Sequence, residues 1–195
     1  MTVIVAPQPA PRLVITDSKH TTTVTVPPSP SIIVSARGPQ GPAATKDYGV
    51  LFLKNNAVPT PISAPNARAV VSGSTQVGEL FNFAKDATTN SLKYLGNGGM
   101  FHLTATFNLT AGNQKTCGFY LGISRDQNAA LDPNGDRISE SEIYVNSSTP
   151  SNQPVAGAVQ TVQQLNTNDR VFFIVQNQTS DTSIVVQFLK LIAWP

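Results

Sequence analysis

The segment from Met100 to Thr110, MFHLTATFNLT, alternates between apolar and polar side chains with a period of two. Side chains in a β-strand point alternately to opposite faces, so this pattern predicts a half-buried strand. The polar face would carry His102 among threonines. The apolar face would carry Phe101, Leu103, Ala105, Phe107 and Leu109.

The same pattern returns in TCGFYLGIS at 116–124, which predicts inward positions for Cys117, Phe119, Leu121 and Ile123 and outward positions for Gly118, Tyr120, Gly122 and Ser124. The turn-forming segment TAGNQK between the two strands predicts an antiparallel hairpin. Short strands at regular spacing, with no convincing helical stretch, predict an all-β sandwich or barrel. Further strands are expected at 48–54, 78–84, 91–96, 141–147, 158–165, 169–177 and 183–194.

Composition changes sharply near Asp47. Eight of the fifteen prolines lie in the first 42 residues, whereas every Phe, Tyr and Trp lies at Tyr48 or later. Residues 1–47 therefore lack the side chains for a core of their own and are expected to form an extended attachment arm. The two Gly-Pro triplets at 38–43 are too short for a collagen triple helix and indicate a hinge. Residues 48–195 are expected to form a head domain.

Three stretches of the arm are rich in Val, Ile and Thr: RLVIT at 12–16, TTTVTV at 21–26 and SIIVS at 31–35. Each is expected to add to the sheet of a neighbouring chain but not to make a sheet alone. The candidate attachment residues are Leu13, Val14, Ile15, Val24, Val26, Ile32, Ile33 and Val34.

The last two expected strands are apolar on both faces. Either they are central strands between two layers, or one face meets another subunit, because a large apolar patch left in water is rare for a monomer. The second alternative predicts a trimer interface formed by Phe172, Ile174, Leu189 and Leu191.

Several functional classes lack the residues they need. Only 12% of residues are charged and the basic ones are scattered, so no basic stripe can follow a nucleic acid backbone. No apolar run approaches the ~20 residues that span a bilayer, and no secretory signal is evident. His20, His102 and Cys117 suggest no catalytic, metal or cofactor site, so we expect a protein that is not an enzyme.

The acidic segment LDPNGDRISESE at 131–142 superficially resembles a calcium loop, but its glycine does not stand at the position that the EF-hand spacing requires. A turn at Asn134-Gly135 is the simplest interpretation. A weak calcium site near Asp132–Asp136 and a glycan-contacting loop are the alternatives. Tyr94, Tyr120 and Tyr144 were candidates for stacking on sugars, although such residues are more often plain strand residues.

GGMFHLTATFNLTAGNQKTCGFYLGIS at 98–124, after a short Gly-Pro segment and before a final SIVVQFLKLIAW, resembles the trimers of the tumour-necrosis-factor and complement globular-head type. The likeness is carried by the Gly99–Phe107 strand and covers residues 48–195. It implies a jelly-roll β-sandwich that forms a homotrimer, and a function does not transfer with the fold.

The first half of the chain, with its Pro/Thr/Val arm and GPQGPA, resembles tailed-bacteriophage virion proteins such as head fibres, decoration or cement proteins and tail fibres. This resemblance implies a capsid decoration protein on the outer surface of the virion, whose arm binds the major capsid protein or other virion proteins. The alternative is a short tail-fibre tip that recognises a host surface glycan through loops such as 126–142. A depolymerase is the third and least favoured class.

Overall fold

The computed structural model describes residues 12–17, 20–25, 47–112, 114–147 and 154–195. The chain divides into two compact units, Met1–Ala43 and Ala44–Pro195. In the first unit, strand β1 (Arg12–Asp17) pairs antiparallel with strand β2 (His20–Thr25), and Arg12 lies opposite Thr25. The prediction that neither stretch forms a sheet without a neighbouring chain was wrong, because the two stretches pair with each other.

The candidate attachment residues of the arm divide into two groups. Leu13, Val14, Ile15 and Val24 occupy positions in β1 and β2. The hinge at 38–43, the expected strand at 31–35 and the remaining four candidates lie outside the described residues: Val26, Ile32, Ile33 and Val34.

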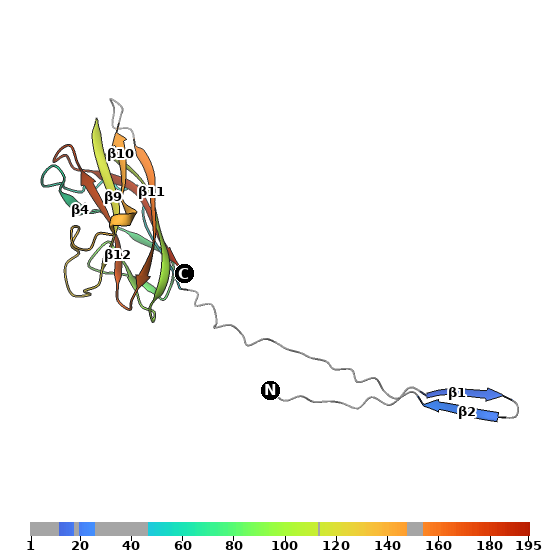
Figure 1. The fold of residues 1–195 in the computed structure, drawn as a ribbon. Coiled ribbons are helices and arrows are strands. Elements are labelled where there is room, and N and C mark those ends of the chain that lie inside the picture. Colours follow the sequence, from blue (N-terminus) through green and yellow to red (C-terminus); the bar gives the residue numbers. More distant parts are fainter. Residues whose placement is uncertain (1–11, 18–19, 26–46, 113, 148–153) are drawn as a thin grey trace. The chain divides into compact units, whose positions relative to one another are not determined.

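The second unit is a sandwich of two β-sheets (Figure 1). One sheet has the order β10 (Ile143–Ser147), β9 (Lys115–Ser124), β12 (Arg170–Asn177), β7 (Leu92–Tyr94) and β6 (Phe83–Lys85), and β4 (Arg68–Val70) also pairs with β12. The other has the order β11 (Val155–Leu165), β8 (Gly99–Thr110), β13 (Val185–Trp194), β3 (Tyr48–Leu53) and β5 (Gln76–Phe81). A short 3-10 helix, η1 (Ser139–Ser141), precedes β10. The described part of the chain contains no helix suited to spanning a membrane.

Long strands that follow one another in the chain often lie in different sheets. β8 is in one sheet, β9 and β10 are in the other, β11 returns to the first and β12 crosses again. This exchange is the jelly-roll arrangement, so the predicted fold class is confirmed. The predicted hairpin of β8 and β9 was wrong: β8 pairs with β11 and β13, while β9 pairs with β10 and β12.

The core lies between the two sheets and is rich in aromatic rings. Phe107 from one sheet stacks on Phe119 from the other with ring centroids 4.0 Å apart, and Phe173 lies 5.3 Å from Phe107. The predicted inward residues of β8 and β9 all belong to this core. Alternation therefore identified the core-facing side of both strands correctly.

The outward side of β9 and β12 is also buried, which the alternation did not predict. Tyr120, Phe172 and Ile174 form a second cluster on the far side of their sheet, and Val70 of β4 and Leu131 of the 125–138 connection pack against it. The second apolar face of β12 is therefore covered within one chain.

The four residues predicted for a trimer interface are all core residues of the single chain. Phe172 and Ile174 are 0% exposed in the second cluster, and Leu189 and Leu191, 2% and 1% exposed, face the space between the sheets. That prediction was wrong, because it took apolar side chains on both faces of a central strand as evidence of a subunit contact.

The expected strand at 78–84 is two strands in different sheets. β5 ends at Phe81 and β6 begins at Phe83, and Asn82 between them has a φ of 54°, which turns the chain out of one sheet into the other. The Asn82 side chain donates a hydrogen bond to Asp47 Oδ1 at 2.6 Å. This contact fixes the start of the second unit against the crossover.

Candidate functional site

Aromatic and aliphatic side chains cross the outer face of the β11–β8–β13–β3–β5 sheet at one level. Phe81 of β5 pairs with Tyr48 of β3. Gly49 of β3 pairs with Ala193 of β13, which places Trp194 beside Tyr48. Trp194 pairs with His102 of β8, and His102 pairs with Val162 of β11. One residue from each of the five strands therefore lies in a single line, which we call the outer row: Phe81, Tyr48, Trp194, His102 and Val162.

The outer row is largely exposed in the single chain. Phe81 is 61% exposed, Val162 48% and Trp194 36%, and Met100, one step farther along β8, is 58% exposed. The Trp194 indole stacks on the His102 imidazole with ring centroids 5.5 Å apart and 13° between the planes. Ile192 extends the row on β13. Apolar side chains thus gather on a sheet face that no other described part of the second unit covers.

Asp47, the residue before Tyr48 of the outer row, anchors the start of the second unit. Asp47 is buried and accepts hydrogen bonds from Tyr94 Oη at 2.5 Å and from Asn82 Nδ2. Burial together with the Asp47 carboxylate raises the pKa of Tyr94 to about 12. Tyr94 therefore keeps its proton and holds Asp47, next to Tyr48, in a fixed position.

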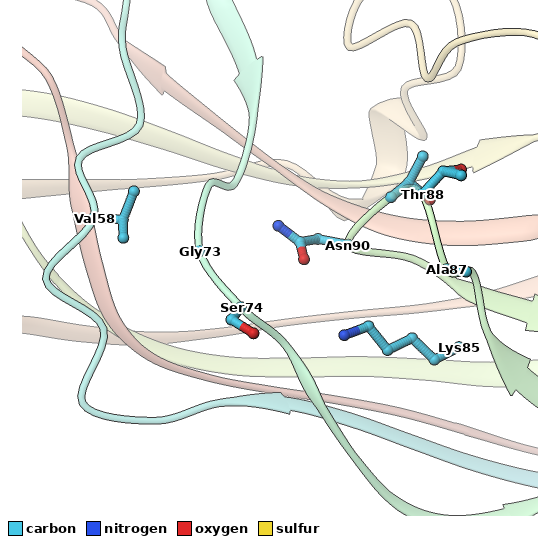
Figure 2. Close-up of a pocket in the computed structure, with 8 residues that line it drawn as sticks. Val58, Gly73, Ser74, Lys85, Ala87, Thr88 and Asn90 are labelled. Atoms are coloured by element: carbon cyan, nitrogen blue, oxygen red, sulfur yellow. The ribbon is translucent and has the colours of Figure 1, made fainter.

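A first hollow of about 460 Å³ lies beside β6, and Figure 2 shows its lining. Lys85 Nζ donates a hydrogen bond to the Thr75 carbonyl oxygen, and Asn90 donates to the Val71 carbonyl oxygen and accepts from Thr75 Oγ1. Its polar groups therefore serve largely to hold neighbouring segments together. The lining residues are Val58, Gly73, Ser74, Lys85, Ala87, Thr88, Thr89 and Asn90.

A second hollow of about 400 Å³ lies between the 125–138 connection, η1 and β11. It brings two guanidinium groups, two carboxylates and one carboxamide together, so it can both donate and accept hydrogen bonds. The lining residues are Ile123, Arg125, Gly135, Asp136, Arg137, Ile138, Glu140 and Gln163.

The buried Arg170, 3% exposed, fastens the 125–138 connection to β12. Its Nη2 donates to the carbonyl oxygens of Asp126 and Ala129, each at 2.6 Å, and to Ser124 Oγ at 3.2 Å. Three charge-assisted hydrogen bonds from one buried side chain give this connection a defined course. No sequence pattern predicts this role, since a lone arginine before an apolar strand has no distinguishing spacing.

The residues proposed for a weak calcium site form a turn. Asp132 Oδ1 accepts the Asn134 N–H at 2.8 Å, and Asp136 Oδ2 accepts the Asp132 N–H at 3.1 Å. The N–H groups of Asn134 and Gly135 hold the pKa of Asp132 below its ordinary value. Within the described ranges, no three His, Cys, Asp or Glu side chains are grouped to hold a metal ion.

Other residues considered from the sequence lie apart from one another. His20 belongs to β2 in the first unit, and His102 lies in the outer row. Cys117 is buried in the core, and burial raises the pKa of its thiol to about 11. Of the three tyrosines considered for sugar stacking, Tyr94 and Tyr120 are buried and only Tyr144 is exposed.

No protein family model matches the chain, and no curated protein matches its sequence. Among solved structures, it is similar to murine APRIL at pH 5.0, with 12% identity and a TM-score of 0.46 over 76% of this chain and 100% of that one. It is similar to Eiger TNF from S. frugiperda, with 11% identity and a TM-score of 0.48 over 77% and 94% of the two chains. Murine APRIL at pH 8.5 has 11% identity and a TM-score of 0.40 over 75% and 98%.

Proposed function

We propose that this chain is a structural, non-enzymatic protein of a bacteriophage virion that decorates or cements the outer capsid surface as a homotrimer. The arm pairs with the major capsid protein or other virion proteins, and the jelly-roll head faces outward. The observation that carries the proposal is the outer row, a line of exposed and mostly apolar side chains that crosses all five strands of one sheet and includes Tyr48, the first residue after the arm.

Burial of the outer row between copies explains its composition. Each Å² of apolar surface removed from water contributes about 25 cal/mol, so aromatic side chains on a sheet face favour association. Because Tyr48 directly follows the anchored Asp47, copies that meet along the row bring the starts of their heads together. The arms of these copies then start close together, as joint attachment to a capsid shell requires.

The mass of the purified protein, measured by light scattering, tests the trimer. We expect three times the 20.7 kDa of one chain. Val162→Glu would bury a charge without a partner and should dissociate the trimer. Leu95→Glu, at an exposed apolar residue off this sheet face, is the matched control and should leave the mass unchanged. A monomeric parent protein would contradict the homotrimer.

Electron microscopy of whole particles tests the location. Density for the head on the shell supports decoration, and density at the tail tip supports the alternative, a short tail-fibre tip that recognises a host surface glycan. The second hollow is the feature that favours this alternative.

A further inference from the structure

The side of β11 that faces the core carries apolar residues at some positions and polar residues at others. Val159 and Leu165 are buried in the core, but Thr161 and Gln163, which share their face, are polar and partly exposed. β11 is the edge strand of its sheet, and Gln163 lines the second hollow at this edge. A sandwich strand normally carries core residues at these positions. The polar residues found there indicate that this edge of the sheet forms an open polar recess.

The residues that line the second hollow carry equal numbers of positive and negative groups, and both of its arginines are also paired with carboxylates beside it. Arg125 and Arg137 supply two positive charges, and Asp136 and Glu140 supply two negative ones. Gln163 adds a neutral carboxamide. Because Arg125 is paired with Asp169 at 2.8 Å and Arg137 lies 4.0 Å from Glu142, the hollow offers no excess positive charge to hold an anion. A neutral ligand with many hydroxyl groups can donate to the carboxylates and accept from the guanidinium groups.

The walls of the hollow are held in place in the free chain. The Ile138 N–H donates to the Leu121 carbonyl oxygen at 2.9 Å, and the Ile123 N–H donates to the Asp136 carbonyl oxygen at 2.8 Å. The Arg137 guanidinium lies over the Tyr120 ring, 5.2 Å from its centroid. Such pre-organisation lowers the conformational entropy lost when a ligand binds.

We propose that the second hollow binds one neutral sugar ring, a hexose or an N-acetylhexosamine, as a free sugar or as the end of a longer glycan. Arg137 and Gln163 donate to ring hydroxyl groups, and Glu140 and Asp136 accept from them. Ile123 and Ile138, each 7% exposed, form the aliphatic base of the hollow beneath the ring. A volume of about 400 Å³ lies within the ~300–1,000 Å³ typical of small-ligand sites. The site lies within one chain and does not depend on the homotrimer.

Saturation-transfer NMR on the full chain tests the site. The probes are methyl galactoside, methyl mannoside and N-acetylglucosamine, with sialic acid as the anionic comparator, each at about 5 mM to populate a site with a Kd near 1 mM. We expect transfer to at least one neutral sugar and none to sialic acid. No transfer to any neutral sugar, or stronger transfer to sialic acid, overturns the proposal.

Variants localise the binding. Glu140→Gln removes a charge-assisted hydrogen bond at the rim and should reduce the transfer at least about 10-fold, whereas Gln163→Ala removes a neutral hydrogen bond and should reduce it about 2- to 10-fold. Thr88→Ala in the first hollow should leave the transfer unchanged. Transfer that persists in both rim variants, or that disappears in Thr88→Ala, overturns the assignment. Light scattering on the same samples reports the oligomeric state separately.

Discussion

At the scale of single residues, buried polar side chains fix the parts of the head that alternation does not describe. Arg170 ties the 125–138 connection to β12, and the Tyr120 hydroxyl contacts Glu142 Oε1 at 2.6 Å and Gln176 Oε1 at 2.5 Å. Both side chains lie on the side of the sheet opposite the aromatic core. The apolar core holds the two sheets together. These polar contacts fix the course of the 125–138 connection, which covers the far side of the sheet.

We expect Arg170→Met to lower the free energy of unfolding by about 3–5 kcal/mol, because it leaves the Asp86 carboxylate, whose side chain is 13% exposed, without its ion-pair partner and the carbonyl groups of Asp126 and Ala129 without their donor. Urea denaturation of the variant measures the loss. Arg125→Met is the control: the Arg125 side chain is 53% exposed and Asp169, 3% exposed, keeps the hydrogen bond from the Asn166 N–H, so the loss should be smaller, about 1–2 kcal/mol. Equal losses in the two variants would contradict the role given to Arg170.

The Cys117 thiol should be inert in the folded protein. Its pKa of about 11, against an ordinary 9, lowers the thiolate fraction at pH 8 about 100-fold, and burial blocks access. The folded state also keeps this proton to a higher pH than the unfolded state, so the free energy of unfolding should fall as the pH rises above 9. Reaction with a chromogenic disulfide, before and after addition of denaturant, is the measurement. Rapid modification of the native protein would contradict the buried placement.

At the scale of elements, the sequence predicted most strands but not their partners. Alternation identifies the core-facing side of β8 and β9, yet it carries no information about which sheet a strand joins. The turn-forming residues between the two strands favour a hairpin, but Gly112 at φ 80° and Gln114 at φ 50° accompany a crossover to the other sheet. For β12, apolar residues on both faces had two explanations, and only the position of the 125–138 connection distinguishes them.

The interior of β9 should be intolerant of added volume. A methyl group at Gly122 would lie 2.5 Å from Phe172 Cζ, and the Phe172 ring is fully buried, so Gly122→Ala should cost about 1–3 kcal/mol. At Gly99 the nearest atom, Phe101 Cε2, would lie 3.4 Å away, and Gly99→Ala should change the stability by less than about 0.5 kcal/mol. Thermal unfolding of both variants makes the comparison, and a smaller loss at Gly122 would contradict the packing described here.

At the scale of the whole molecule, the sequence predicted an arm and a head but misplaced the candidate interface. Phe172 and Leu189 were among the predicted interface residues because their strands are the most apolar. The outer row draws single residues from five strands, and their alignment depends on the register between strands. Register follows from the assembled sheet and not from any one segment. A sequence pattern could identify Trp194 or Val162 as outward residues, but not as neighbours.

Deletion of residues 1–43, which leaves Asp47 and its hydrogen bonds with Asn82 and Tyr94 in place, should leave a folded head that, under the proposed function, no longer joins the particle. The core lies entirely within the second unit, so its stability should not depend on the arm. Far-ultraviolet circular dichroism checks the fold, and the amount of protein in purified particles checks attachment. Incorporation of the truncated head at normal occupancy would show that the arm is not the anchor.

The central position of β13 sets the order of events during synthesis. β13 lies between β8 and β3, yet it is the last of the described strands to leave the ribosome. At a synthesis rate of about 5–20 residues per second, β3 and β8 wait several seconds for the strand that joins them. Throughout that interval the sheet that carries the outer row is split in two. The association of copies that we propose along the outer row therefore requires a completed head.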